Sequence, residues 1–330
     1  MEQECPHNRL GTAIAPLSCT GGLKNGVEPT VLGSLAPGKG FHNTVGPLLF
    51  CTIEGGVRRT NRPWTGDMST RRVDLNSDVG ESFGAYTIGH DDRLLSSVTS
   101  ANIACGYHAG DPSVMRATVR QAIEHAVALG AHPGFPDLVG FGRRRLSASP
   151  AEVEDLVLYQ IGALSGIVLA EGGRLTHVKP HGALYNMASE ERPVANAVAR
   201  AVKAFDGSLV LFGLSGSRLL EAGQAEGLTV ASEVFADRTY QANGALVSRT
   251  TLGAVIDDVA SVVERAIDMV ATGTVTPVGG EPFTVRADTI CVHGDTPGAV
   301  ELAAGLRAGL EAAGIGVVAV ARAKPAGQTQ

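Results

Sequence analysis

Polar side chains that can move protons or bind ions recur at every second position in three short segments of this sequence. Each segment alternates them with apolar or small residues: Asp74, Asn76 and Asp78; His177, Lys179 and His181; Cys291, His293 and Asp295. Alternate side chains on a β-strand point to the same face, although Pro180 is expected to end the second strand before His181. Carboxylates, imidazoles and an amine gathered in one space are typical of general acid–base catalysis.

Other predicted strands also end in ionisable or amide side chains. These are Asn102, Cys105 and His108 after one strand, His132 at the end of the next, and Glu233, Asp237 and Arg238 at another. A single residue of this kind is more often a hydrogen-bonded structural group than a functional one. Six strands that all end this way are harder to explain by packing, because a buried charge without a partner is costly. The pattern therefore predicts a functional site at the carboxyl-terminal ends of the strands.

Strand and helix patterns alternate along the chain from residue 73 onward. The predicted strands cover residues 73–78, 98–104, 129–132, 175–180, 208–214, 229–235, 289–293 and 315–320. The predicted helices cover residues 112–128, 150–170, 193–205, 217–226, 252–272 and 298–313. Strands separated by helices form parallel sheets through right-handed connections. Seven or eight such units in the 259 residues from 72 to 330 predict a single β/α barrel, with a doubly wound open sheet as the alternative.

Residues 1–71 differ from the rest of the chain in composition. Gly and Pro make up 17 of these 71 residues, and the net charge is +2, against −8 for residues 72–330. No sustained period of a strand or a helix occurs in this segment. It is predicted to be a disordered N-terminal extension, or upstream sequence that is not part of the working protein, in which case Met68 is a natural start. The barrel domain is expected to span residues 72–330.

The composition of the whole chain excludes several classes of protein. It has 330 residues, of which 44% are hydrophobic and 18% charged, with a net charge of −6. No apolar run approaches the roughly 18 residues of a membrane helix, and the acidic balance argues against a nucleic-acid partner. Five Cys residues are too few for a disulfide framework, so a cytoplasmic location is expected.

Seven longer motifs, taken in order, resemble one known family. They are Asp74–Glu81 (DLNSDVGE), Ser100–Pro112 (SANIACGYHAGDP), Gly130–Gly134 (GAHPG), Gly140–Arg144 (GFGRR), His177–Asn186 (HVKPHGALYN), Phe235–Tyr240 (FADRTY) and Cys291–Asp295 (CVHGD). Together they closely resemble the LamB/YcsF family, to which the A subunit of bacterial ATP-dependent 5-oxoprolinase belongs. The likeness runs from about Val73 to Ala321. One departure is Ser77, where the family usually carries Cys, so a thiol at this position is not expected to be a general requirement.

The resemblance implies a fold, an activity and partners. The implied fold is a β/α barrel of the glycoside hydrolase/deacetylase group. The implied activity is cleavage of the 5-oxoproline lactam to L-glutamate, with ATP as co-substrate, by an enzyme that also contains subunits B and C. Phosphorylation of the amide oxygen would make it a leaving group, and a general base could then direct water to the ring carbon.

In this scheme each candidate residue receives a role. The expected catalytic residues are Asp78, His132, Lys179, His181, His293 and Asp295. The expected substrate- or phosphate-binding residues are Glu81, Asn102, His108, Arg143, Glu233, Asp237 and Arg238. Asp78, His132 and His181 would activate water and transfer protons, while Lys179 and Arg143 would hold phosphate or carboxylate oxygens. A divalent metal is a further option, bound by Asp78, His132, His181 and His293.

Structural roles remain open for several of these residues. Lys179 could simply pair with Asp78 or Glu233 across the barrel, and Arg143–Arg145 could form a solvated basic loop. Asn102 and Glu81 could serve only to satisfy backbone groups of the surrounding loops. Cys105 and Cys291 are expected to be packed core thiols.

Two nucleotide-binding motifs are absent or misplaced in this sequence. Gly314–Ala319 matches G-x-G-x-x-A but follows a predicted helix and enters a strand, the reverse of a dinucleotide-binding turn. No G-x-x-x-x-G-K-[ST] sequence occurs, so ATP must bind through other groups or on a partner protein. Two other functions also stay open, a stand-alone metal-dependent deacetylase or amidohydrolase, and a non-catalytic chain that only binds substrate or its partners.

Overall fold

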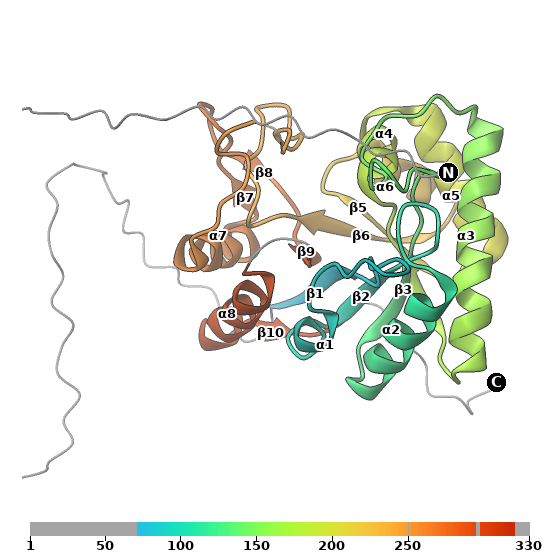
Figure 1. Ribbon diagram of the computed structural model, residues 1–330. Helices are drawn as coiled ribbons and strands as arrows, with labels where there is room; N and C mark the ends of the chain where they lie inside the picture. The colour runs from blue at the N-terminus through green and yellow to red at the C-terminus, as the bar shows by residue number, and fades with distance from the viewer. Residues whose placement is uncertain (1–70, 250, 295–297, 321–330) are drawn as a thin grey trace, which may run out of the picture. The chain divides into compact units, whose positions relative to one another are not determined.

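A closed barrel of parallel strands forms the centre of the molecule (Figure 1). The computed structural model describes residues 71–249, 251–294 and 298–320. Within these ranges, seven strands close the barrel in the order β1-β2-β3-β4-β5-β6-β9, and β9 pairs back with β1. These strands are β1 (Arg72–Val79), β2 (Ser100–Ala104), β3 (Ala128–His132), β4 (Leu175–Val178), β5 (Val210–Leu214), β6 (Thr229–Val234) and β9 (Thr289–His293). The prediction of a single barrel is therefore confirmed, and the open sheet is excluded.

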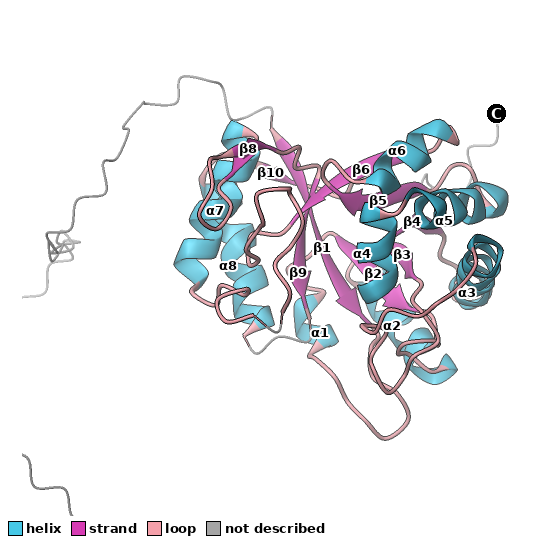
Figure 2. Cartoon of the chain, turned by 90° about the horizontal axis from the view of Figure 1, so that it is seen from above, coloured by secondary structure: helices cyan, strands magenta, loops and turns pink. Residues whose placement is uncertain are grey.

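Helices surround the barrel, as Figure 2 shows from above. They are α1 (Asp91–Leu94), α2 (Pro112–Glu124), α3 (Pro150–Ala170), α4 (Gly182–Glu190), α5 (Arg192–Phe205), α6 (Arg218–Ala225), α7 (Val259–Thr272) and α8 (Ala299–Ala312). Asp111 caps α2 by accepting hydrogen bonds from two backbone N–H groups, and Ser149 caps α3 through a capping box with Glu152. The sequence therefore located the starts of both helices correctly.

Alternation along each strand divides the barrel into an apolar outer side and a polar interior. On β1, the buried residues Val73, Leu75 and Val79 belong to the main hydrophobic core between the strands and the helices. The buried Asp74 and Asn76 make their side-chain hydrogen bonds to residues of other strands. The strand pattern in the sequence thus indicated correctly which face of β1 carries the polar groups.

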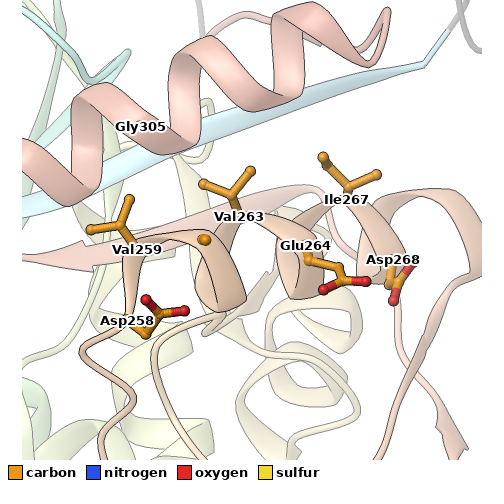
Figure 3. A pocket seen from close by; sticks show the side chains of 8 residues that line it. Asp258, Val259, Val263, Glu264, Ile267, Asp268 and Gly305 are labelled. Atoms are coloured by element: carbon orange, nitrogen blue, oxygen red, sulfur yellow. The ribbon is translucent and has the colours of Figure 1, made fainter. Parts of the chain in front are cut away.

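Helices α7 and α8 pack side by side on the outside of the barrel (Figure 3). Their close approach depends on glycine, because a Cβ at Gly305 would lie 2.7 Å from Val259 Cγ1 and one at Gly309 only 2.3 Å from Val263 Cγ1. A shallow pocket beside this contact is lined by Val259, Val263 and Ile267. A second cavity opens at the carboxyl-terminal ends of the barrel strands, and it shares no lining residue with this pocket.

The structure corrects several predicted boundaries. The predicted helix 252–272 begins only at Val259, where the Asp258 side chain accepts a hydrogen bond from the Ser261 backbone. Leu252, which suggested an earlier start, is fully exposed in a loop that follows β6. Helix α4 was not predicted, because Pro180 and Gly182 are typical of loops. The predicted last strand is reduced to β10 (Gly316–Val317), which pairs with the start of β1, and a short hairpin of β7 (Thr274–Val275) and β8 (Phe283–Thr284) was missed.

One expectation falls almost wholly on residues outside the described ranges. The extension predicted for residues 1–71 lies there except for Arg71, so the division into an extension and a barrel domain stays a prediction.

The expectation that no segment is long and apolar enough for a membrane span was too broad. Helix α3 is long and apolar enough by composition, with a mean hydropathy of 1.5. In the barrel one face of α3 is buried, which is also typical of a core helix.

Candidate active site at the barrel mouth

A cavity of about 840 Å³ opens at the carboxyl-terminal ends of the barrel strands. Seven of the residues predicted from the sequence line it: Asp78, His132, Arg143, Lys179, His181, Arg238 and His293. Five others are buried beside or beneath it without lining it: Glu81, Asn102, His108, Glu233 and Asp237. Asp295 lies outside the described residues. Most of the predicted residues therefore come together at one end of the barrel.

Lys179 lines the cavity and is held by four other side chains. Its ammonium group is 2.8 Å from Glu233 Oε1 and 3.0 Å from Asp78 Oδ1, and it also donates to Asn76 Oδ1 and Cys291 Sγ. Burial opposes its charge, but the two carboxylates hold the pKa of Lys179 well above its usual range. Both pairings that the sequence left open are thus present, and the lysine remains a buried cation.

Glu233 is fully buried below the cavity, with a donor at each oxygen. Oε1 accepts from Asn76 and Lys179, and Oε2 accepts a 2.6 Å hydrogen bond from the Tyr185 hydroxyl. Burial and the adjacent carboxylate raise the pKa of Tyr185 well above its usual range, so its hydroxyl stays a donor. This carboxylate is positioned to fix Lys179 rather than to contact a molecule in the cavity.

Asp78 connects the lysine to the histidines. Its Oδ1 accepts hydrogen bonds from Asn102 and Lys179, and its Oδ2 lies 3.4 Å from His132 Nε2. Burial by itself favours the neutral acid, but His132 and Lys179 hold the pKa of this carboxyl well below its usual range. Asp78 is therefore an anion at the edge of the cavity, a state suited to accepting a proton from a polarised water.

His132 and His181 form a close pair beside Asp78. Their facing atoms, His132 Nε2 and His181 Nδ1, are 2.9 Å apart, and their rings are nearly perpendicular. The other nitrogen of each ring contacts a backbone carbonyl, that of Lys179 for His132 and that of Phe141 for His181. Burial, with a smaller contribution from His132, lowers the pKa of His181 to about 3.

His108 and Glu81 complete a cluster with this histidine pair. His108 stacks on His181 with ring centroids 3.8 Å apart, and its Nε2 lies 3.7 Å from Glu81 Oε1. Neither ring nitrogen of His108 has a hydrogen-bond partner among the described residues. The four side chains Glu81, His108, His132 and His181 each offer a ligand atom, all within 4.8 Å of one another, so this buried group could hold a metal ion. We call it the mouth cluster.

The loop that covers the mouth cluster lies tightly against it. A Cβ at Gly142 would lie 2.7 Å from His108 Cβ and 2.8 Å from His181 Cδ2, and Gly142 also has a φ of +63°. The preceding Phe141 adopts a φ of 53° despite its side chain, in the region that favours glycine. Its carbonyl is the one that receives the hydrogen bond from His181. The strained turn thus fixes one ring of the cluster.

His293 and Asp237 form a second acid–imidazole contact, on the other side of the cavity. His293 Nδ1 is 3.2 Å from Asp237 Oδ2, and the His293 ring stacks on Phe235. Burial opposes ionisation of Asp237, but His293 and Arg238 lower its pKa overall. Asp78, Cys291 and His293 form a second, smaller group with metal-ligand atoms close together. The four residues that the sequence suggested for a metal are therefore divided between two groups.

Arginines surround the upper part of the cavity. Arg143 and Arg145 line it, Arg143 with its guanidinium 4.9 Å from the Phe141 ring centre and Arg145 paired with Glu191, whereas Arg144 pairs with Asp137 and does not line the cavity. Arg238 donates to the carbonyls of Val247 and Ala254, and burial together with Arg249 lowers its pKa to about 10. The positive charge of these arginines favours the binding of an anionic ligand.

Sequence reasoning missed lining residues contributed by the loop between β6 and α7. Gln241, Asn243 and Arg249 line the cavity from this loop. The signal was present, because residues 236–249 contain many polar side chains, but residues 252–258 were predicted to be part of a helix. Tyr185 was also missed, although it lies in the HVKPHGALYN motif.

The thiols and the family departure at Ser77 have structural explanations. Cys105 and Cys291 are both buried, as expected, and burial raises the pKa of Cys105 to about 12. Ser77 donates a 2.6 Å hydrogen bond to the Val292 carbonyl and does not line the cavity. Ser77 therefore stabilises the pairing of β1 with β9 and is not part of the cavity lining.

Comparisons with known proteins agree with the motif resemblance. The profile of the LamB/YcsF family matches residues 73–325. The chain is similar to the 5-oxoprolinase A subunit of Heliobacterium modesticaldum, with 54% identity over 248 residues, which are 75% of this chain and 98% of that protein. The protein of the same name from Bacillus licheniformis is 56% identical over 248 residues, again 75% of this chain and 98% of the relative.

One solved structure shows the same similarity in three dimensions. It is the lactam utilization protein from Thermus thermophilus, with 50% sequence identity and a TM-score of 0.72. The superposition covers 75% of this chain and 99% of that structure. Both kinds of comparison thus match nearly the whole of the relative to the barrel part of this chain.

Proposed function

Because this chain belongs to the LamB/YcsF family and is more than half identical to proteins named as 5-oxoprolinase A subunits, we propose that it is the A subunit of an ATP-dependent 5-oxoprolinase. The observation that carries the proposal is this identity over 98% of the relatives' length. The enzyme would open the lactam of 5-oxoproline to L-glutamate, together with subunits B and C and coupled to hydrolysis of ATP to ADP and phosphate.

The reaction requires water to attack an unreactive amide carbon. The ring C–N bond breaks, a water oxygen joins the former carbonyl carbon as part of the side-chain carboxylate, and the ring nitrogen takes protons to become the amino group. Phosphorylation of the amide oxygen by ATP before the attack activates this carbon; departure of the ring nitrogen then leaves an acyl phosphate, and a second water converts it to the side-chain carboxylate and phosphate. The site must therefore deprotonate water, protonate nitrogen and stabilise negative charge on oxygen.

The residues on the cavity floor suit the proton-transfer steps. Asp78 is a buried anion that lies 3.4 Å from His132 and faces the cavity. In this scheme Asp78 accepts the proton of the attacking water. Asp78 then delivers this proton to the leaving nitrogen, while His132 and His181, whose rings also line the cavity, hold the attacking water.

The cations suit the anionic parts of the substrate. Lys179 lines the cavity while it is fixed by Glu233 and Asp78, so it can stabilise charge that develops on the amide oxygen. Arg143 and Arg238 can hold the substrate carboxylate or a phosphate through paired N–H groups. His293, oriented by Asp237, would fix the substrate's position opposite the histidine pair.

ATP use is proposed for the assembled enzyme rather than for this chain alone. The sequence contains no P-loop, and no described lining of the cavity offers a glycine-rich turn followed by Lys and Ser or Thr. We therefore assign to subunits B and C the binding of ATP, and to this barrel the site where the lactam carbon is attacked.

Reconstitution with the two partner proteins tests this function. Glutamate and phosphate are measured with 5-oxoproline and ATP, and each protein is omitted in turn. Glutamate should form only when all three chains are present. Replacement of Asp78 by Asn or His132 by Asn should lower the rate by about 100-fold or more, the usual contribution of a general acid or base. His125→Asn is the matched control, because His125 is exposed at the end of α2.

Two outcomes would refute the proposal. Glutamate formation without this chain would assign the chemistry to its partners. Hydrolysis of N-acetyl sugars by the isolated chain, without ATP, would support the stand-alone deacetylase instead. Circular dichroism of the Asp78 and His132 variants must match that of the wild type for the rates to be compared.

A further inference from the structure

The hydrogen bonds of the histidine pair determine where its lone pairs point. A backbone carbonyl can only accept a hydrogen bond, so His132 Nδ1, 2.7 Å from the Lys179 carbonyl, must carry a hydrogen. The same reasoning places a hydrogen on His181 Nε2, which is 2.8 Å from the Phe141 carbonyl. In neutral rings the remaining nitrogens, His132 Nε2 and His181 Nδ1, then present two lone pairs to each other at 2.9 Å. Such a contact is repulsive unless a positive charge lies between or beside these atoms.

We propose that a divalent first-row transition-metal ion binds at the mouth cluster, with His132 Nε2, His181 Nδ1 and Glu81 Oε1 as its protein ligands. Glu81 Oε1 lies 3.5 Å from His181 Nδ1, and all three atoms belong to the group whose members are within 4.8 Å of one another. Two imidazoles and one carboxylate are a ligand set suited to Fe²⁺, Mn²⁺ or Co²⁺ with further positions left open.

The spacing of the two nitrogens favours a six-coordinate ion. With metal–nitrogen bonds of about 2.05 Å, atoms 2.9 Å apart subtend an angle of about 90° at the metal. A tetrahedral ion would require the two nitrogens to move about 0.4 Å further apart. We therefore expect octahedral ions to be preferred over Zn²⁺.

His108 is assigned a positioning role beside the metal. It is 1% exposed, and neither of its ring nitrogens has a hydrogen-bond partner in the described part of the chain. Its ring is parallel to that of His181, at an interplanar angle of 4°, so both rings cannot direct their lone pairs at the same ion. Its Nε2 is instead 3.7 Å from Glu81 Oε1, from which a small shift would form a hydrogen bond that orients the carboxylate ligand.

The surroundings meet the other requirements of a metal site. Metal ligation needs an oriented imidazole, and His132 and His181 each use their other ring nitrogen to donate to a backbone carbonyl, which orients the ring. Both proposed histidine ligands line the cavity, which gives an ion a path of entry. A carbonyl or water oxygen that enters the cavity can therefore approach these two ligands.

Metal binding by the full chain tests the site directly. The protein is stripped with a chelator and titrated with Co²⁺, and binding is followed by calorimetry and by the visible absorption of bound Co²⁺. We expect one ion per chain with the weak absorption of a six-coordinate site. His132→Asn and His181→Asn should each weaken the binding by more than about 100-fold, and Glu81→Gln by at least about 10-fold. His125→Asn, at an exposed histidine, should bind like the wild type.

A second measurement on the wild type keeps the test valid if a variant fails to fold. Pulsed EPR of the Mn²⁺-loaded protein should detect the nitrogens of coordinated imidazole. Absence of these couplings, or Co²⁺ binding that is equal in the wild type and in a folded His132→Asn, His181→Asn double variant, would overturn the proposal. A proton held between His132 and Asp78 would then balance the lone pairs. Because binding is measured without 5-oxoproline, ATP or partner proteins, its outcome is independent of the proposed lactam hydrolysis.

Discussion

The barrel interior contains two buried polar regions that differ in how completely their hydrogen bonds are matched. The lower region consists of buried polar residues of the barrel interior that do not line the cavity, Asp74, Asn76, Asn102, His177, Glu233 and Thr289. In it, Asp74 accepts hydrogen bonds of 2.5, 2.8 and 2.6 Å from the hydroxyls of Thr99, Ser100 and Thr289. In the mouth cluster, two histidine lone pairs face each other at 2.9 Å, and the His108 ring makes no hydrogen bond to any described residue. Both regions consist of side chains with little exposed area, so burial alone does not distinguish them.

This difference distinguishes buried polar groups that stabilise the fold from buried polar groups that are available to bind a ligand. A buried network with a donor for each acceptor stabilises one arrangement of the strands. An unmatched buried group costs about 1–3 kcal/mol, and the fold retains it only where something else depends on it. We therefore expect changes in the lower region to affect mainly folding, and changes in the mouth cluster to affect mainly binding and catalysis.

Lys179 joins the two regions, and its removal should have the largest effect. Lys179→Ala leaves Glu233 and Asp78 without their shared cation, so we expect a loss of about 3–5 kcal/mol in the free energy of unfolding as well as the loss of activity. Urea unfolding followed by circular dichroism measures the first effect.

A second substitution identifies the cause of that loss. Glu233→Gln removes one of the two stranded charges, so the double variant should be about 1–3 kcal/mol more stable than the sum of the single effects predicts. Additive effects, within about 0.5 kcal/mol, would show that Lys179 stabilises the barrel through packing and not through its charge.

The lower region should also set a pH dependence of stability. Burial raises the pKa of Asp74 from 3.8 to about 6 in the folded state, against the opposing effect of its three hydroxyl partners. Between these two values the unfolded chain has released the proton and the folded chain has not. The Asp74 contribution to stability is therefore greatest below pH 3.8 and falls by up to about 3 kcal/mol as the pH rises above 6.

The comparison of wild type with Asp74→Asn isolates this effect. The stability of the wild type relative to the variant should decline as the pH rises from about 4 to about 7, on top of a constant cost from the altered hydrogen bonds. Asp137→Asn is a control of opposite sign, because the hydrogen bond from Arg144 lowers the pKa of Asp137 and its contribution is lost as the pH falls. Parallel curves for the wild type and Asp74→Asn would contradict the assignment.

The sequence predicted the barrel, and which residues gather at its polar end, more accurately than it predicted how far each residue lies below the cavity. Alternation along β1 correctly placed Asp74 and Asn76 inside, because the period of a strand fixes which face a side chain occupies. It could not show that Glu233 lies beneath the cavity, because depth depends on how the strands are staggered around the barrel. The described residues thus follow the predicted fold, apart from the boundaries already corrected.

The contacts within the mouth cluster were beyond prediction for a related reason. The lone pairs of His132 and His181 are fixed by the carbonyls of Lys179 and Phe141, which lie 47 and 40 residues away along the chain. The stacking of His108 on His181 likewise requires the loop around Gly142 to close over both rings. Such contacts depend on tertiary geometry that a local pattern of residue types does not contain.

A smaller effect is expected from filling space in the lower region. Gly130 on β3 lies against His177, and a Cβ there would meet His177 Nε2 at 2.0 Å. Gly130→Ala should therefore cost about 1–3 kcal/mol through overpacking. Gly166→Ala on α3, where no atom lies within 4 Å of the new Cβ, should instead stabilise the chain by about 0.5–1 kcal/mol. Thermal or urea unfolding distinguishes these outcomes, and equal stabilities of the two variants would mean that His177 has room to move.

The most direct comparison of the two regions replaces one buried histidine in each. His177 Nε2 is 2.9 Å from Asn102 Oδ1, so His177→Leu leaves that buried oxygen without this donor and should cost about 1–3 kcal/mol. The His108 ring has no hydrogen-bond partner in the described ranges, so the stacking on His181 that His108→Leu loses is offset by the removal of an unmatched polar group. The stability of the metal-free chain should therefore change by no more than about 0.5 kcal/mol, the smallest effect expected here. Urea unfolding in the presence of a chelator compares the two variants. A larger loss for His108→Leu would mean that its stacking on His181 stabilises the fold, and the mouth cluster would then be as structural as the region beneath it.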